Sequence, residues 1–540
     1  MKITAAEAIL KIIKEQGTNV VYGYPGAAIA PLYDKLCQTD LKHILVRNEQ
    51  GSAHAASSYF KMTGKIGVCI STSGPGATNL ITGIANAYMD SIPIVAITGQ
   101  VACSAVGKDS FQEVDVTGVT TPITKQNYLV KNAEDIVRVM REAFYIAGTG
   151  RPGPVVVDVP VDILCETVEF TPFEPQKILG YDPEPKASDN QIKKLAKMLK
   201  SAKRPLFVLG GGVLSSGASY DFVRLIEKLN VPVVSTLMGI SGINSAHRLY
   251  LGMAGQHGTF SANEAFAKAD TIIFAGARVS DRAVFAPKTL SERAKIIHLD
   301  IDPAEINKNI PANLSIIANI KDVIEKLIAS VDFTAPDTWT KACTGAKAKN
   351  IKAEDSSSGF VNPKLFIKKL SKKAPADAII STEVGQHQIW AANHYDFKEP
   401  NTFLTSGGFG TMGYGFPAAL GAKIAAPDKT VIALEGDGSF QMVMPELATM
   451  KQYGADVKIV LFVNRSLGLV RDYQKLYYNS NYSCVDLGDY PHFDKIAAAY
   501  DIDHLAITDN SEIDAAIDKL LAQKGSFLLE VLVSDTESTL

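Results

Sequence analysis

The sequence predicts an α/β protein of three doubly wound domains, each built around a parallel sheet. Short apolar runs of strand length alternate with segments of helical period along the whole chain, which is the pattern of parallel α/β domains. At 540 residues the chain is too long for a single hydrophobic core. Two stretches without a sustained period, 171–188 and 332–359, are predicted to be linkers between the domains.

Each predicted domain contains apolar runs that can be placed as buried strands. The first domain is expected over residues 1–170, the second over 189–331 and the third over 360–540, each of ordinary domain size. The strand candidates, in chain order, are Ile44–Val46, Ile66–Ser71, Ile92–Thr98, Pro205–Leu209, Thr271–Ala275, Lys295–Asp300, Val431–Leu434, Lys458–Val463 and Phe527–Val533.

The composition excludes several classes of protein. Apolar residues make up 46% of the chain and charged residues 21%, which is ordinary globular usage. The net charge is −3 with no basic stripe, so we expect no nucleic-acid partner. The six cysteines are scattered without a CxxC pair, which predicts reduced core thiols. Without an apolar run of about 18 residues or a cleavage site, we expect no membrane span and a cytoplasmic location, or an organelle after loss of a transit segment.

The most informative stretch is VIALEGDGSFQMVMPELATMKQYGADVKIVLFVNRSLG. An apolar strand turns at Gly436, Asp437 and Gly438, and a second apolar strand ends at Asn464. Glycines at a strand end let the backbone approach a diphosphate, and the carboxylate can bind a metal. Both oxygen donors are expected at the carboxyl ends of neighbouring strands, where open α/β sheets bind ligands. A bare GDG is more often only a turn, but the asparagine at this spacing predicts a Mg²⁺–diphosphate site.

This spacing resembles the signature of thiamine-diphosphate enzymes, a GDG followed by a paired asparagine. The resemblance extends in order along nearly the whole chain. The matching stretches are VYGYPGAAI, RNEQGSAHAA, TSGPGATN, GQV, DSFQEVD, LGMAGQHGT, GARVSDR, HLDIDPAEINKN, EVGQHQIWAA, SGGFGTMGYGFPAALG and NRSLGLVRDYQ. On these residues the chain resembles the acetohydroxyacid synthase (acetolactate synthase) large-subunit family. The resemblance implies two thiamine-diphosphate-binding folds, one for the pyrimidine at 1–170 and one for the diphosphate and Mg²⁺ at 360–540, flanking a Rossmann-like FAD-binding domain at 189–331.

The resemblance implies a carboligase acting on 2-oxo acids. Pyruvate would lose CO₂, and the hydroxyethyl carbanion would attack a second 2-oxo acid to give 2-acetolactate or 2-aceto-2-hydroxybutyrate, in branched-chain amino-acid or acetoin-type metabolism. The implied cofactors are thiamine diphosphate, Mg²⁺ and FAD. The implied assembly is a homodimer or homotetramer with active sites at the interface, and a small regulatory subunit is a further candidate partner.

Two alternatives stay open. One is another thiamine enzyme, either a 2-oxo-acid decarboxylase or a pyruvate oxidase. The other belongs to a different class, a nucleotide-binding regulatory or scaffold protein without turnover. The joint presence of Glu49, Asp437 and Asn464 argues against the scaffold, because a protein without turnover need not keep all three groups.

The cofactor residues are implied by their places in the matching stretches. Glu49 of RNEQG matches the glutamate that relays a proton at N1′ of the pyrimidine, although a helix N-terminus also favours a carboxylate. Met412 of GTMG matches the methionine that holds the cofactor bent, where the alternative is a core filler. The implied metal ligands are Asp437, Asn464 and the backbone carbonyl of Ser466. Further cofactor-binding residues are implied at Gly23, Pro25, Gly26, Ser73, Gly74, Gln386, His387, Gly410, Gly436, Gly438 and Ser439.

Substrate and flavin residues are implied in the same way. Arg282 of SDR matches an arginine whose guanidinium suits the carboxylate of the second substrate, a surface ion pair being the alternative. Phe111, Gln112 and Lys125 match positions lining the channel above the reacting carbon, and Val384 matches a valine near that carbon. The implied FAD-binding residues are Gly211, Gly212, His257, Arg278 and Asp300.

The chain departs from the family pattern at several positions. Val463 replaces the first asparagine of the usual pair, and Asn319 stands where an aspartate is usual in the middle domain. SDR lacks the Thr-Gly that follows DDR, and the tail ends at DTESTL without a Pro-rich lid segment. Leu469 and Tyr473 replace a methionine and a tryptophan. That tryptophan shapes the pocket favouring 2-oxobutyrate, so Tyr473 predicts that pyruvate competes well as acceptor.

Overall fold

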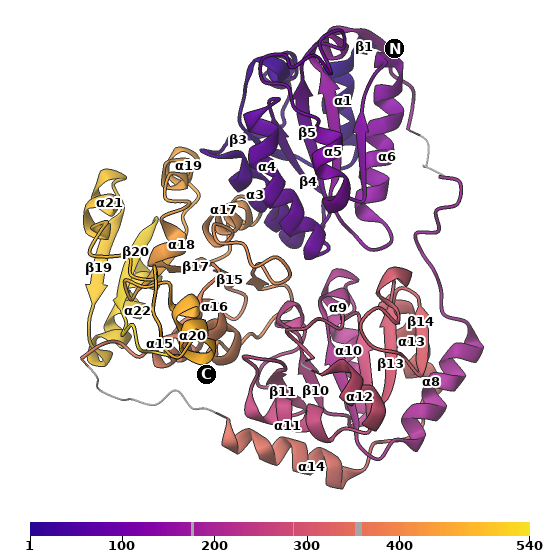
Figure 1. Ribbon diagram of the computed structural model, residues 1–540, viewed down its shortest axis with the longest axis vertical. Coiled ribbons are helices and arrows are strands. Elements are labelled where there is room, and N and C mark those ends of the chain that lie inside the picture. Colours follow the sequence, from indigo (N-terminus) through magenta and orange to yellow (C-terminus); the bar gives the residue numbers. More distant parts are fainter. Residues whose placement is uncertain (174–177, 285, 351–358, 540) are drawn as a thin grey trace.

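The computed structural model describes residues 1–173, 178–284, 286–350 and 359–539. Most of its strands lie in three six-stranded sheets. Neighbouring strands within these sheets are parallel. Figure 1 shows three units, the N-terminal one at the top, the middle one at the lower right and the C-terminal one at the lower left. The predicted fold class, α/β with three doubly wound parallel sheets, is confirmed.

The N-terminal sheet carries helices on both faces. Its strands in spatial order are β3 (Lys42–Leu45), β2 (Val20–Gly23), β4 (Gly67–Ser71), β5 (Ile94–Gln100), β7 (Val155–Pro160) and β6 (Gln126–Leu129). Its helices are α1 (Ala5–Glu15), α2 (Ala30–Leu36), α3 (Glu49–Thr63), α4 (Pro75–Met89), α5 (Val116–Thr120), α6 (Ile136–Gly148) and α7 (Val161–Cys165). Val68 and Ile70 of β4 pack with α1 and α6, whereas Cys69 packs with α3 and α4, because successive strand residues face opposite sides.

The middle sheet has the strand order of dinucleotide-binding folds. Its strands in spatial order are β11 (Tyr250–Met253), β10 (Val233–Ser235), β9 (Pro205–Leu209), β12 (Thr271–Ala275), β13 (Lys295–Asp300) and β14 (Leu314–Ile317). Its helices are α8 (Asp189–Ser201), α9 (Gly211–Ser215), α10 (Ser219–Leu229), α11 (Phe260–Lys268), α12 (Pro287–Arg293) and α13 (Ile320–Ser330). Counted along this domain the order is 3-2-1-4-5-6, which is that of Rossmann folds.

The C-terminal sheet repeats the topology of the N-terminal one. Its strands in spatial order are β16 (Phe403–Leu404), β15 (Ile379–Thr382), β17 (Val431–Gly436), β18 (Lys458–Val463), β20 (Phe527–Leu532) and β19 (Asp503–Ile507). Its helices are α15 (Pro363–Lys373), α16 (Gln386–His394), α17 (Gly415–Ala425), α18 (Asp437–Phe440), α19 (Glu446–Tyr453), α20 (Gly468–Tyr477), α21 (Phe493–Ala499) and α22 (Ile513–Ala522). Counted along each domain, both flanking sheets have the order 2-1-3-4-6-5.

Each sheet has a point where the strand order reverses, and open α/β sheets bind ligands in the crevice there. The reversals lie between β2 and β4, between β9 and β12, and between β15 and β17. The loops that follow these strands are 24–26 and 72–74, 210 and 276–284, and 383–385 together with the start of α18 at Asp437. Most of the predicted cofactor residues belong to these loops or to their immediate neighbours, so the topology positions three ligand-binding edges.

The predicted linker at 332–359 contains a helix. This helix, α14 (Asp337–Ala346), places Trp339 and Cys343 in a core cluster of the middle domain, and the Trp339 indole donates to the Pro205 carbonyl oxygen at 2.8 Å. In Figure 1 it lies along the lower edge of that domain. The expectation of an irregular linker is therefore wrong over this helix, whose narrow apolar stripe gives little periodic signal. Residues 351–358 lie outside the described residues.

A short antiparallel pair was also not predicted. β1 (Lys2–Thr4) pairs with β8 (Thr167–Glu169) and ties the two ends of the N-terminal domain together. Strands of three residues are too short to show an alternating pattern. The other predicted linker, 171–188, has no helix or strand among its described residues, and 174–177 lie outside them.

The structure also bears on the predicted state of the cysteines and on the predicted absence of a membrane span. All six cysteines are free thiols. Cys69 and Cys343 are buried, as expected, but the expectation of core positions is wrong for the exposed Cys37, Cys103, Cys165 and Cys484. Along the described ranges, no helix combines the length and the apolar character that crossing a membrane requires.

Candidate active site

The predicted metal ligands lie at the ends of two neighbouring strands. β17 and β18 pair in parallel, so Asp437, which follows β17, and Asn464, which follows β18, lie at the same edge of the sheet, as predicted. The Asp437 carboxylate accepts hydrogen bonds from the backbone N–H of Gly438 at 3.0 Å and of Arg465 at 2.6 Å. The second of these ties the two strand ends together. Asn464 Oδ1 accepts from the backbone N–H of Ser466 at 3.0 Å.

The chemistry of these donors fits Mg²⁺ held together with a diphosphate. Asp437 is 5% exposed, and burial raises the pKa of its carboxyl group to about 6, an effect that its backbone donors offset only in part. A bound cation would favour the charged form. In the described part of the chain, no three His, Cys, Asp or Glu side chains form a metal cluster. A site with one carboxylate and one amide oxygen suits Mg²⁺, because phosphate oxygens and water can complete its octahedral coordination.

His387 lies between two glycines beside the GDG turn. A Cβ atom would lie 2.4 Å from His387 Cε1 if added at Gly385, and 2.7 Å from it if added at Gly436. Both positions therefore have to be glycine for the ring to fit. Burial lowers the pKa of His387 to about 3, so the ring is neutral. Its buried Nε2 has no hydrogen-bond partner among the described residues, which fits a site where a polar ligand group approaches.

Gln386, predicted to bind the diphosphate, is committed to protein partners. Its Nε2 donates to Asp472 Oδ2 at 2.9 Å and to the Glu537 carbonyl oxygen at 2.7 Å. Its Oε1 accepts from Asn464 Nδ2 at 3.1 Å. Because both N–H groups of the amide are used, direct contact between this side chain and a diphosphate stays a prediction.

Glu49 begins α3 in the N-terminal domain and is 8% exposed. Asn79 of α4 donates to Glu49 Oε2 at 2.9 Å. A Cβ atom added at Gly76 would lie 3.2 Å from Glu49 Oε1, so the first turn of α4 lies against the carboxylate. Asn48 already caps the helix by accepting from the backbone N–H of Gln50 at 2.9 Å. The carboxylate of Glu49 is therefore not needed as the cap, and the favourable helix N-terminus is the structural explanation left for it.

The predicted cofactor turns after β2 and β4 lie against each other. A Cβ atom would lie 2.5 Å from the Thr72 side chain if added at Gly26, and 2.3 Å from a backbone oxygen of β4 if added at Gly23. This close approach requires glycine at both positions. Pro25 is exposed at the tip of its turn, whereas Ser73 is buried.

The predicted channel residues separate into two places. The Gln112 backbone lies against the cofactor turn, since a Cβ atom at Gly74 would be 2.7 Å from its carbonyl oxygen. Its neighbour Phe111 is 86% exposed. The Lys125 ammonium instead donates to the backbone carbonyl oxygens of Ile146 and Thr149, the second at 2.6 Å. Burial lowers the pKa of Lys125 to about 8. The channel role of Lys125 stays a prediction.

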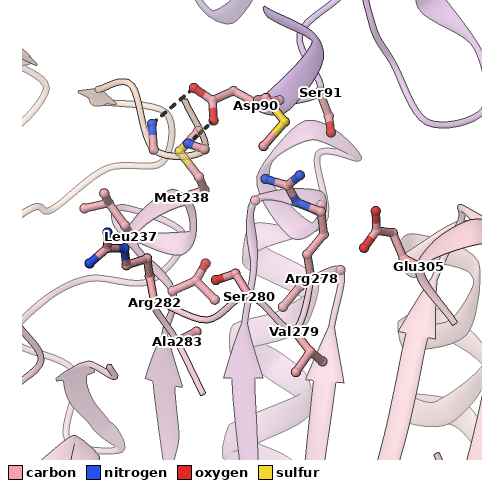
Figure 2. A pocket seen from close by; sticks show the side chains of 18 of the residues that line it. Asp90, Ser91, Leu237, Met238, Arg278, Val279, Ser280, Arg282, Ala283 and Glu305 are labelled. Carbon is pink, nitrogen blue, oxygen red and sulfur yellow. Dashed lines mark hydrogen bonds between the residues drawn. The ribbon is translucent and has the colours of Figure 1, made fainter. Parts of the chain in front are cut away.

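A loop at 406–412 carries Gly410 and the half-buried Met412. Asp90, at the end of α4, accepts from two consecutive backbone N–H groups of this loop at 3.2 and 2.7 Å, the dashed lines in Figure 2. Asn86, one turn earlier, accepts from two hydroxyl groups of the same loop. Neither residue was predicted. The signal that could have found them is a pair of polar residues four apart in the mainly apolar stretch that ends α4.

Glu49 and Asp437 share no hydrogen-bond partner among the described residues. The described side-chain partner of Glu49 is Asn79, within the N-terminal domain. The described partners of the Asp437 carboxylate are backbone groups of its own domain. A single chain therefore presents two separate groups of predicted cofactor residues.

A cavity of about 1170 Å³ lies where the three domains meet. It includes the strand-order reversal of the middle sheet, after β9 and β12. In Figure 2, Arg278 extends from the middle domain toward the side of the cavity where Asp90 lies. The predicted flavin residues all line this cavity: Gly211, Gly212, His257, Arg278 and Asp300.

Family models match the three domains in order. Residues 3–119 match the N-terminal TPP binding domain of thiamine pyrophosphate enzymes, 192–327 the central domain and 383–531 the C-terminal TPP binding domain. A probable acetolactate synthase large subunit of Methanocaldococcus jannaschii is 43% identical over 99% of this chain and 92% of its own length. The acetolactate synthase large subunit of Lactococcus lactis is 42% identical over 99% and 94%, and that of Haemophilus influenzae 39% over 99% and 95%.

The chain belongs to the acetolactate synthase large-subunit family. Within the wider group of thiamine pyrophosphate enzymes, the two domains that the sequence predicted to bind the cofactor are those matched by TPP binding models. The predicted family and the predicted thiamine diphosphate cofactor are confirmed.

Some of the residues predicted to contact substrate in this acetolactate synthase family member line the same cavity as the flavin residues, whereas Phe111, Gln112 and Lys125 are not among its lining residues. Those that line it include Arg282, Val384, Leu469 and Tyr473. The Arg282 guanidinium donates to Gln256 Oε1 at 2.8 Å, so its described partner is an amide and not the carboxylate of a surface ion pair. Tyr473 is 50% exposed. Its ring therefore borders the cavity while remaining open to solvent.

Two buried carboxyl groups behind the site were not predicted. Glu383 and Glu435 are both 0% exposed. Glu383 accepts from the backbone N–H of Gly413 at 2.8 Å and of Gly415 at 2.7 Å, whereas neither Glu435 oxygen has a partner in the described chain. Burial raises the pKa of Glu383 to about 7, and burial with the nearby Glu383 charge raises that of Glu435 well above its usual range. An acid inside the apolar runs IISTEV and VIALEG is the signal that could have found them.

Proposed function

We propose that this chain is an acetolactate synthase, which decarboxylates pyruvate and joins the two-carbon unit to a second 2-oxo acid. The products would be 2-acetolactate or 2-aceto-2-hydroxybutyrate. The observation that carries the proposal is the Asp437–Asn464 pair at the ends of β17 and β18, beside the strand-order reversal of the C-terminal sheet. Relatives that match this chain over nearly their full length are named acetolactate synthase large subunits. The names of these relatives favour the synthase over a decarboxylase or a pyruvate oxidase.

The residues suit distinct parts of this reaction. Asp437, Asn464 and the backbone carbonyl of Ser466 would hold Mg²⁺ beside the diphosphate. When bound, thiamine diphosphate supplies the electron sink for loss of CO₂ from a 2-oxo acid. Glu49, oriented by its hydrogen bond from Asn79, would hold a proton at N1′ of the pyrimidine.

The second substrate needs a cation for its carboxylate. Arg282 lies in the wall of the cavity, and its fixed guanidinium plane suits a carboxylate. Phe111 and Gln112 would border the channel to the reacting carbon, because the Gln112 backbone packs on the cofactor turn. These roles assign substrate orientation to the loops of the N-terminal and middle domains.

We also infer that FAD occupies the three-domain cavity. A volume of about 1170 Å³ is large for a small substrate alone, since ligand pockets are commonly about 300–1,000 Å³. The middle sheet has the dinucleotide-binding strand order. At its reversal point the start of α9 supplies Gly211 and Gly212, and the loop after β12 supplies Arg278.

A second copy of the chain is part of the proposal. Glu49 and Asp437 have their described partners in different domains, and the large apolar side chains Tyr24, Phe111 and Met442 are 41%, 86% and 60% exposed near the two groups. A homodimer or homotetramer with its active sites at the interface would cover them. The relatives are named large subunits, which favours a small regulatory subunit as a further partner.

Product analysis tests the proposed function. Purified protein would be supplied with pyruvate, Mg²⁺ and thiamine diphosphate, with and without 2-oxobutyrate, and the products identified. Acetolactate, and acetohydroxybutyrate in the mixed reaction, is the expected result. Acetaldehyde as the main product would instead identify a decarboxylase, and acetyl phosphate with peroxide an oxidase. Light scattering on the same sample gives the number of chains in the assembly.

A further inference from the structure

The Gln386 side chain has a single possible orientation in its hydrogen-bond network. Asp472 Oδ2 and the Glu537 carbonyl oxygen can only accept, so the atom that faces both of them, at 2.9 and 2.7 Å, must be the nitrogen of the amide. The oxygen of the amide then faces Asn464. The Asp472 carboxylate and the Glu537 carbonyl oxygen together therefore fix which end of Gln386 is presented to the predicted metal ligand, and of these two acceptors only Asp472 is a side chain.

The same reasoning carries one step further, to Asn464. Because Gln386 Oε1 can only accept, Asn464 must turn its Nδ2 toward it, at 3.1 Å. Asn464 Oδ1 is thereby directed away from Gln386, and it accepts from the Ser466 backbone N–H at 3.0 Å. An amide oxygen has two lone pairs, so it can accept this bond and still bind a cation. Mg²⁺ requires the oxygen and not the nitrogen of an amide.

The start of α20 is shaped to keep Asp472 in this position. Gly468 and Asp472 are four residues apart and so lie on one face of the helix. A Cβ atom added at Gly468 would lie 2.0 Å from Gln386 Oε1, so glycine lets the helix approach the amide. Thr539 Oγ1 lies 3.4 Å from the same Asp472 oxygen that Gln386 contacts. The carboxylate is thus held from both sides.

We propose that Asp472 is a positioning residue for the metal site. By accepting from Gln386 it orients two amides in series, so that Asn464 presents its oxygen to Mg²⁺. The proposal rests on the Mg²⁺ site of the proposed function. It gives Gln386 a role through Asn464 that does not depend on direct contact with the diphosphate.

Binding of Mg²⁺ tests the proposal without reference to turnover. Calorimetric titration of Mg²⁺ into protein saturated with thiamine diphosphate would compare the parent with Asp472→Leu and Asp472→Asn. Loss of a partner that orients a metal ligand typically weakens metal affinity about 10–100-fold, which we expect for Asp472→Leu. Asp472→Asn keeps an acceptor oxygen and should bind Mg²⁺ nearly as the parent does. The matched control is Arg471→Gln, which removes a neighbouring ion pair to Asp535 and leaves Gln386 untouched.

A double-mutant cycle adds a second readout. If Asp472 acts through Gln386, then Gln386→Leu should lower Mg²⁺ affinity and Asp472→Leu should lower it little further in that background. Parent-like affinity in Asp472→Leu, equal losses in the Asn and Leu variants, or additive losses in the double variant would each overturn the proposal. A parent protein that binds no Mg²⁺ with thiamine diphosphate would overturn the proposed function as well, which distinguishes the two failures.

Discussion

At the scale of single residues, buried carboxyl groups differ by the donors that surround them. Glu383 lies at the end of β15 and has backbone N–H donors, whereas Glu435 has no partner within the described chain. An unpaired buried carboxylate is costly, so Glu435 should be the protonated member of the pair. Because burial raises the pKa of both groups and the Glu383 charge raises that of Glu435 further, they titrate as a coupled pair.

This pair predicts a pH dependence of stability. A folded-state pKa raised above the ordinary carboxyl value means that the folded protein binds more protons than the unfolded one. The free energy of unfolding therefore falls as pH rises from the ordinary carboxyl range through the folded pKa, by up to about 1.4 kcal/mol per pH unit for one group. Glu435→Gln should flatten this fall. Urea unfolding of cofactor-free protein from acid to neutral pH measures it, and parallel curves for variant and parent would contradict the prediction.

Glu49 gives the most direct prediction at the residue scale. In Glu49→Gln the amide can still be oriented by Asn79 but cannot hold and release the proton. Turnover should fall by about 10²–10⁴, the usual contribution of a general acid–base group, while thiamine diphosphate affinity stays close to that of the parent. Acetolactate formation and calorimetry measure the two effects. Glu134→Gln, at an exposed position, is the control, and parent-like turnover in Glu49→Gln would remove this residue from the mechanism.

At the scale of elements, local patterns decided what could be predicted from the sequence. The predicted strands were recognised because each is a short apolar run between turn residues, as in β9 and β18, whereas the equally buried β2 and β7 were not among them. α14 was missed because few of its residues are apolar, although Trp339 anchors it. The hydrogen bond between Gln386 and Asp472 joins separate elements that only the folded sheet brings together. Contacts of this kind leave no periodic signal in the sequence.

The packing of α17 on α3 predicts a strong effect of one methyl group. Gly421 of α17 lies so close to α3 that an added Cβ atom would be 2.3 Å from the Ala55 carbonyl oxygen and from Ser58 Oγ. Gly421→Ala should therefore destabilise the protein by about 1–3 kcal/mol, the usual effect of overpacking.

The control for that substitution is Gly345→Ala in α14. An added Cβ atom there meets nothing within 4 Å, so alanine should stabilise the helix by up to about 1 kcal/mol through its higher propensity. Urea unfolding of both variants gives the two changes in the free energy of unfolding. A Gly421→Ala variant as stable as Gly345→Ala would show that α17 and α3 do not pack this closely in solution.

At the scale of the whole molecule, the three domains meet around one cavity. Because a ligand bound there contacts all three domains, it should stabilise the folded state of each of them. Residues of each domain line it, including Asp90, Arg278 and Gln388. The sequence could predict which loops belong to the middle domain's binding edge. It could not predict that the N-terminal and C-terminal domains close over this edge, because the closing contacts, such as Asp90 to the 406–412 loop, join distant parts of the chain.

Adding FAD should therefore raise the stability of the whole chain. A ligand at about 100 times its dissociation constant stabilises the folded state by about 2.7 kcal/mol, and the same shift should be seen by probes in each domain. Arg278→Ala should weaken FAD binding by about tenfold or more, because a charged hydrogen bond contributes about 1.5–3 kcal/mol. Arg224→Ala, whose ion pair with Asp221 lies within α10, should bind FAD as the parent does. Equal FAD affinity in both variants would place the flavin elsewhere, and a parent protein whose unfolding does not change with FAD would contradict the flavin proposal itself.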